Sequence, residues 1–116
     1  MVDAQVVARP ESYNRITEIL GCKWSLAIFD ALQRGINRPG QIERAFPGLT
    51  TKVLHRCLNR LEGDGVLTKT IYEELPYRVE YSLTAKGQLL VSLLENAKEL
   101  AAQWQPAPDS QPVASG

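Results

Sequence analysis

Residues 50–65 read TTKVLHRCLNRLEGDG, and this stretch decides how the rest of the chain is arranged. Thr50 and Thr51 are good N-cap candidates, no helix breaker follows them, and Gly63 and Gly65 close the run. The pattern predicts a helix over residues 51–62 that is amphipathic at about 100° per residue. Its apolar arc contains Val53, Leu54, Cys57, Leu58 and Leu61. Its polar arc contains Thr51, Lys52, His55, Arg56, Asn59 and Arg60.

The polar arc carries hydrogen-bond donors and positive charge but no acid until Glu62. Lys52, Arg56 and Arg60 are spaced four residues apart, and like charges at that spacing destabilise a helix slightly. We therefore expect a compensating partner outside the helix. DNA would provide one, because its phosphates attract Lys and Arg and its base edges accept and donate hydrogen bonds. The alternative from this helix alone is a basic surface paired with acids elsewhere in the fold.

Length and composition limit the classes of protein to which the chain can belong. The 116 residues suffice for one domain with a single core, and 44% hydrophobic with 22% charged residues is ordinary for a globular protein. The formal net charge is zero, so nucleic-acid binding has to depend on a local patch such as helix 51–62. No apolar run approaches the roughly 18 residues that span a bilayer, and the N-terminus lacks the features of a signal peptide. We expect a cytoplasmic protein without membrane contact.

The segments around helix 51–62 predict a winged helix-turn-helix, mainly α with a small β-hairpin. A short helix over residues 39–46 precedes it across the turn Pro47-Gly48, which is the helix-turn-helix arrangement. Residues 67–72 form a β-branched and aromatic run, and residues 78–83 alternate apolar and polar side chains. With the loop that contains Pro76 between them, they predict the wing hairpin over residues 67–83. The expected segments are a flexible arm (1–11), a helix from Ser12, an apolar helix from about Cys22 to Gly35, a long helix after Thr84 (85–104) and a disordered tail (105–116). The domain itself is expected to span residues 12–104.

The terminal helices are expected to form a dimer interface. Apolar residues of the last helix are spaced alternately three and four apart over two heptads, as in a coiled coil. A helix of about 20 residues is roughly 30 Å long and would extend beyond so small a domain. Packing of this helix on its own domain is the alternative. The residues expected at the interface are Tyr13, Ile16, Leu90, Leu93, Ala97, Leu100 and Trp104.

Three segments resemble the HxlR-type winged-helix transcriptional regulators of the MarR-like superfamily. They read GCKWSLAIFDAL (21–32), FPGLTTKVLHRCLNRLEGDGVL (46–67) and LPYRVEYSLTAKG (75–87), in the order of the family, and the resemblance covers about residues 12–104. It implies a homodimer that regulates transcription. It also implies a recognition helix in the major groove and a wing near the adjacent DNA backbone.

The chain departs from the family pattern at two places. Redox-sensing members carry a Cys-Pro pair upstream of a Gly-Gly-Lys-Trp motif, whereas this chain has Glu11 and Ser12 there and Cys22 in place of the second Gly. A common Arg-Glu pair of the recognition helix is replaced by Asn59 and Arg60, so an operator preference does not carry over.

We expect a dimer to place two recognition helices in successive major grooves of an inverted repeat, about 34 Å apart. The groove-facing set is Thr51, Lys52, His55, Arg56 and Asn59, with Arg60 nearer the phosphates. Candidates for wing and backbone contacts are Arg38, Gln41, Lys69, Tyr77 and Arg78. His55 has a plainer alternative as a solvated surface residue, and three glutamates in the wing oppose close approach to DNA. The rival function is a winged domain whose basic helix binds an acidic protein without specific DNA binding.

Two interpretations of Cys22 stay open. The start of a helix and the adjacent Lys23 both stabilise a thiolate, which favours a redox or electrophile sensor. A small packing residue between two apolar helices is the alternative. Cys57 lies on the apolar arc of helix 51–62 and is expected to be an inert core residue. The sequence shows no metal-ligand spacing, phosphate-binding loop or nucleophile set, so we expect no metal, cofactor or enzymatic activity, and it identifies no effector.

Overall fold

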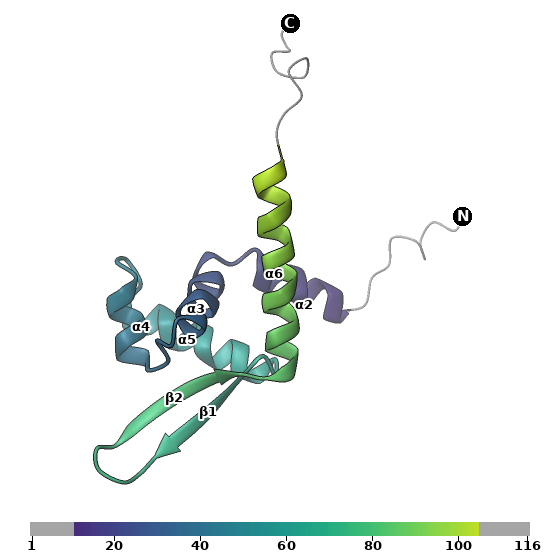
Figure 1. Ribbon diagram of the computed structural model, residues 1–116. Coiled ribbons are helices and arrows are strands. Elements are labelled where there is room, and N and C mark those ends of the chain that lie inside the picture. Colours follow the sequence, from purple (N-terminus) through teal and green to yellow (C-terminus); the bar gives the residue numbers. More distant parts are fainter. Residues whose placement is uncertain (1–10, 105–116) are drawn as a thin grey trace, which may run out of the picture.

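The computed structural model describes residues 11–104 (Figure 1). The expected arm and tail, residues 1–10 and 105–116, lie outside this range, and Glu11, expected in the arm, is the first residue of a helix. The helices are α2 (Glu11–Leu20), α3 (Lys23–Gln33), α4 (Pro39–Ala45), α5 (Thr51–Gly63) and α6 (Ala85–Gln103). Strands β1 (Leu67–Tyr72) and β2 (Arg78–Leu83) lie between α5 and α6.

The core is built around α3 and the apolar arc of α5. Ile28, Phe29 and Ala31 of α3 are at most 1% exposed, so α3 forms the buried centre of the domain. Leu54 and Leu58 of α5 are completely buried against them. The predicted apolar arc therefore faces inward, and burial of such side chains at roughly 1.5–3 kcal/mol each holds α5 in a fixed orientation.

Two threonine caps set where α5 and α6 begin. The Thr50 hydroxyl accepts a hydrogen bond from the Val53 N–H at 3.2 Å, as the sequence predicts. The Thr84 hydroxyl accepts from the Gly87 N–H at 3.1 Å and donates to the Gly65 carbonyl at 2.6 Å. Thr84 therefore caps α6 and also ties its start to the turn that follows α5.

The wing is an antiparallel hairpin that projects away from the helices (Figure 1). Its register pairs Leu67 with Leu83 at the root and Tyr72 with Arg78 near the tip, within the predicted limits 67–83. The Tyr81 N–H donates to the Asn37 carbonyl at 2.9 Å, which anchors β2 to the turn between α3 and α4. The position of the wing relative to the helix-turn-helix is therefore fixed at its root.

Only the first half of α6 packs on the domain, and the rest stands clear of the other elements (Figure 1). Its buried residues are Gly87, Leu90 and Val91, all within the first two turns. A Cβ atom at Gly87 would collide with the Val66 carbonyl oxygen and lie 2.9 Å from the Leu83 side chain. Glycine at this position is what allows α6 to pack closely on the root of the wing.

Candidate nucleic-acid interface

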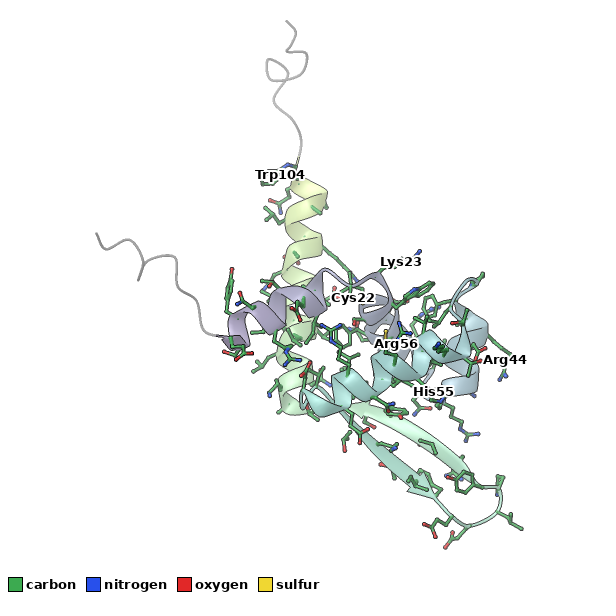
Figure 2. All side chains as sticks on the ribbon, turned by 180° about the vertical axis from the view of Figure 1, so that it is seen from behind. Cys22, Lys23, Arg44, His55, Arg56 and Trp104 are labelled. Atoms are coloured by element: carbon green, nitrogen blue, oxygen red, sulfur yellow. The ribbon has the colours of Figure 1, made fainter. Side chains whose placement is uncertain are left out.

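The polar face of α5 is open to solvent and keeps its positive charge. Lys52, His55, Arg56 and Asn59 are all exposed. Within residues 11–104, neither Lys52 nor Arg56 forms an ion pair. Figure 2 shows His55 and Arg56 on α5 and Arg44 on the neighbouring α4. This face therefore presents two cations without an acidic partner from the described part of the chain.

The two ends of the face are held by acids from other helices. The Thr51 hydroxyl donates to Glu43 Oε2 at 2.7 Å, which joins the start of α5 to α4 across the turn. Arg60 Nη2 lies 2.8 Å from Glu18 Oε1 of α2, with both side chains about half exposed. Among the residues that the structure describes, the alternative of internal acidic partners thus applies to Arg60 but not to Lys52 or Arg56. An exposed ion pair of this kind contributes at most about 1 kcal/mol, so Arg60 can exchange Glu18 for a phosphate.

His55 has one ring nitrogen occupied by its own helix. Its Nδ1 lies 3.1 Å from the Thr51 carbonyl oxygen, and because a carbonyl oxygen only accepts, Nδ1 must carry the hydrogen. In the neutral imidazole the Nε2 atom is then a hydrogen-bond acceptor. In a major groove it could accept from the amino group of cytosine or adenine.

Arg78 of the wing and Arg38 at the start of α4 are more constrained than the sequence indicated. Arg78 Nε lies 3.0 Å and Arg38 Nε 3.5 Å from the same Glu80 carboxylate oxygen. The Arg78 guanidinium also lies over the Tyr72 ring, 4.0 Å from its centroid. Glu80 is thus neutralised by two arginines, and both guanidiniums are partly committed to the protein. The other predicted backbone contacts, Lys69, Gln41 and Tyr77, are exposed.

Sequence reasoning missed one residue of this surface, Arg44. It lies in the last turn of α4, is exposed and forms no ion pair within the described residues. The first helix of a helix-turn-helix crosses the DNA backbone, so an exposed arginine there is positioned for a phosphate. The signal available in the sequence was a basic residue on the outward side of the short helix before the turn.

Cys22 and Cys57 interact across the junction of α3 and α5. Partial burial raises the pKa of Cys22, but hydrogen bonds from the Ser25 hydroxyl, the N–H groups of Ser25 and Trp24, and the Cys57 thiol lower it overall. Burial, the negative charge of Cys22 and the hydrogen bond to Cys22 raise the pKa of Cys57, against an opposite effect of Arg60 and Arg56. The expectation that Cys57 is buried is confirmed, but it is also in contact with the second thiol of the chain.

An apolar face that no other element of residues 11–104 covers lies over α2 and the free part of α6. Of the residues predicted for dimerisation, Leu90 is only 6% exposed and packs in the chain's own core. The others are exposed: Tyr13, Ile16, Leu93, Ala97, Leu100 and Trp104. Figure 2 shows Trp104 at the far end of α6. Between α2 and α6 lies a hollow of about 580 Å³ whose apolar lining includes Ile16, Leu89 and Leu93.

Two kinds of site are not found in the described part of the chain. No group of three or more His, Cys, Asp or Glu side chains in residues 11–104 could hold a metal ion. No helix among these residues is both long enough and apolar enough to cross a membrane.

The helix-turn-helix with its wing defines the chain as a winged-helix protein of the transcriptional-regulator type. A model of the HxlR-like helix-turn-helix family matches residues 19–109, and the chain belongs to that family. It is 38% identical over 91 residues to the HTH-type transcriptional regulator sll1512 of Synechocystis, covering 78% of this chain and 67% of that protein. The resemblance read from the three sequence segments is thereby confirmed.

Solved structures share the fold. A MarR-family transcriptional regulator from Enterococcus faecalis superposes with a TM-score of 0.73 at 33% identity, covering 87% of this chain and 92% of that one. The redox regulator HypR in its oxidised form superposes with a TM-score of 0.69 at 28% identity, covering 83% of this chain and 99% of that one. The winged helix-turn-helix predicted from the sequence is therefore confirmed both by the structure and by these neighbours.

Proposed function

We propose that this protein is a transcriptional regulator that binds specific double-stranded DNA through the exposed face of α5. The observation that carries the proposal is that Lys52 and Arg56 face solvent without an acidic partner from residues 11–104. Next to them, His55 and Asn59 offer acceptors and donors suited to base edges. Membership of the HxlR-like family supports the same function.

The proposed contacts divide into base edges and backbone. Arg56, Asn59 and His55 lie in the middle of α5 and are assigned to base edges in the major groove. Lys52 and Arg44 lie nearer the ends of the two helices and are assigned to phosphates. Arg60, Gln41, Arg38 and the wing residues Lys69, Tyr77 and Arg78 are secondary contacts to sugar and phosphate.

We propose that a second copy of the chain covers the apolar face of α2 and α6. Leu93, Leu100 and Trp104 are 47%, 55% and 72% exposed, which is unusual for three large apolar side chains on one helix. With Ala97 included, these residues are spaced four, three and four apart, which fits pairing with another helix of the same kind. The dimer would present two α5 helices to an inverted repeat with half-sites about 34 Å apart.

The pairing is tested by Leu100→Glu, with Leu75→Glu in the exposed wing loop as the matched control. Leu75 is 93% exposed, so its substitution adds the same charge away from the proposed interface. Sedimentation analysis should show that Leu100→Glu raises the dissociation constant of the dimer at least tenfold, while Leu75→Glu stays dimeric. A monomeric wild type, or equal behaviour of the two variants, would contradict the proposed interface.

DNA binding is tested with Arg56→Ala on an operator obtained by selection from genomic fragments, with Lys98→Ala as the control. Lys98 lies on α6 and is paired with Glu95. The substitution Lys98→Ala therefore removes the same charge at a place away from α5. Losing one base contact costs roughly 1–3 kcal/mol, so loss in both subunits should weaken binding at least about thirtyfold. Lys98→Ala should leave the affinity within twofold of wild type.

The salt dependence of the same assay separates DNA from an acidic protein partner. Specific DNA binding predicts an affinity that falls steeply with salt and prefers one duplex over random sequence. Equal affinity for all duplexes, together with no loss in Arg56→Ala, would refute the proposal and favour the protein partner.

The proposal also includes a cytoplasmic location and a thiol response through Cys22. The structural neighbour HypR, a redox regulator solved in its oxidised form, supports the thiol response.

A further inference from the structure

The chain contains two cysteines, and the fold brings them together. Cys22 precedes the first residue of α3 and is half-buried, whereas Cys57 lies on the inward side of α5 and is 9% exposed. Both thiols are free. α3 and α5 pack on each other, and across this junction the two thiols share a side-chain hydrogen bond. Residues far apart in the sequence thus form one thiol pair.

The two thiols have different chemical roles available to them. Cys22 sits where the free N–H groups of Trp24 and Ser25 and the Ser25 hydroxyl stabilise a thiolate, which is the nucleophilic form. Cys57 is the more buried group and keeps its proton, so it is suited to act second. A partly exposed thiol with a lowered pKa next to a more buried thiol is the arrangement of an attacking and a resolving cysteine.

We propose that Cys22 and Cys57 of the same subunit form a redox switch, in which a hydroperoxide produces an in-chain disulfide that weakens DNA binding by α5. The second half of this proposal rests on the DNA-binding function proposed above. The family resemblance offered no such pair, because the upstream Cys-Pro motif of sensing members is absent from this chain.

The chemistry balances with a hydroperoxide as the two-electron oxidant. The Cys22 thiolate attacks the terminal peroxide oxygen, the O–O bond breaks, and Cys22 becomes a sulfenic acid while the released oxygen leaves as water or an alcohol. The Cys57 sulfur then attacks the Cys22 sulfur, and the sulfenic oxygen leaves as water with the Cys57 proton. Two thiols are oxidised to one disulfide, and one peroxide is reduced.

In the proposed switch, bond formation draws α5 toward the start of α3. A disulfide holds its sulfurs at about 2.05 Å, which is shorter than the donor–acceptor distance of any hydrogen bond. Cys57 is therefore drawn toward the start of α3, and its neighbour Arg56 on the same helix moves with it. The C-terminal end of α5 is tied to α2 by Arg60–Glu18 at 2.8 Å and Arg15–Asp64 at 3.2 Å, so a pull at Cys57, in the middle of α5, tilts the helix instead of shifting it as a whole.

Burial of Cys57 favours pairing within one subunit. A disulfide between subunits would require a thiol that reaches the surface, but Cys57 faces α3 of its own chain and is 9% exposed. The exposed apolar face proposed for dimerisation lies on α2 and α6 and does not include Cys57.

The experiment treats the full-length reduced protein with hydrogen peroxide and maps its disulfides by mass spectrometry without reduction. Trypsin should release ITEILGCK (16–23) linked to CLNR (57–60), from protein that runs as a monomer on a non-reducing gel. The matched variants are Cys22→Ser, which retains a favoured N-cap residue, and Cys57→Ala, which retains a small apolar side chain. Neither should form the linked peptide. If Cys57→Ala fails to fold, the peptide maps of wild type and Cys22→Ser alone decide whether the Cys22–Cys57 disulfide forms.

The consequence is measured on the selected operator with the same samples. Oxidation should raise the Kd of the wild type at least tenfold, dithiothreitol should restore it, and both variants should bind equally with or without peroxide. A disulfide between subunits, or no disulfide at all, would overturn the thiol pair. A Cys22–Cys57 disulfide with unchanged Kd would overturn its regulatory effect. Because the peptide map needs no DNA, it decides on the disulfide even if the reduced protein shows no specific binding.

Discussion

Glu80 of the wing holds two arginines in ion pairs, and removing its negative charge should strengthen DNA binding. Arg38 and Arg78 approach one Glu80 carboxylate oxygen at 3.5 and 3.0 Å, and the Glu80 side chain is 22% exposed. Glu80→Gln keeps the shape of the side chain and removes its charge. The guanidiniums then lose their acidic partner but not their location, since Arg78 still lies over Tyr72 at 4.0 Å.

The size of the effect follows from the two ion pairs. Each partly exposed pair contributes at most about 1 kcal/mol to stability, so the variant should remain folded. Each phosphate newly contacted by an arginine makes the slope of log affinity against log salt steeper by about 0.9. One or two such contacts per subunit predict a slope steeper by roughly 1–2 per subunit and, at 50 mM salt, an affinity at least about fivefold higher.

The assay is fluorescence anisotropy on the selected operator between about 50 and 200 mM salt, the range in which phosphate contacts change affinity most visibly. Glu73→Gln is the matched control, because Glu73 is an exposed wing acid that forms no ion pair within the described residues. It makes the same charge change without releasing an arginine. An unchanged slope in Glu80→Gln, or a slope equal to that of Glu73→Gln, would refute the idea that Glu80 withholds arginines from DNA. Weaker binding would mean that Glu80 supports the wing.

Two further predictions concern the junction of α6 with the wing. Thr84→Ala should lower the free energy of unfolding by about 2 kcal/mol, since it removes a helix cap and the hydrogen bond to Gly65 at 2.6 Å, whereas Thr50→Ala removes only a cap and should cost about 1 kcal/mol. Urea unfolding at one fixed protein concentration compares them, and equal losses would contradict the double role of Thr84. Gly87→Ala should destabilise more than either, because its methyl group would meet a backbone carbonyl, and calorimetry should show the largest drop in Tm of the three. A Tm within 2 °C of wild type would show that the junction relaxes instead.

Much of the local structure could be predicted because it depends on short-range patterns. The Thr50 and Thr84 caps, the inward arc of α5 and the limits of the wing all follow from side chains within a few residues of one another. The set of exposed donors on α5 could be predicted for the same reason, since a helix separates its faces by sequence spacing alone. Leu90 fell on the predicted dimer stripe but lies in the core, because the stripe of α6 continues from its buried half into its free half.

The sequence by itself determined the winged helix-turn-helix, the face of α5 that meets solvent and the family to which the chain belongs. Only the tertiary structure decided which charges remain available and which thiols meet. Glu18 lies beside Arg60, Glu80 beside two arginines and Cys57 beside Cys22 because α2, α3, α5 and the wing converge on one core. Such pairs join residues from separate elements. Their distances depend on how helices and strands pack, and no local periodicity encodes that packing.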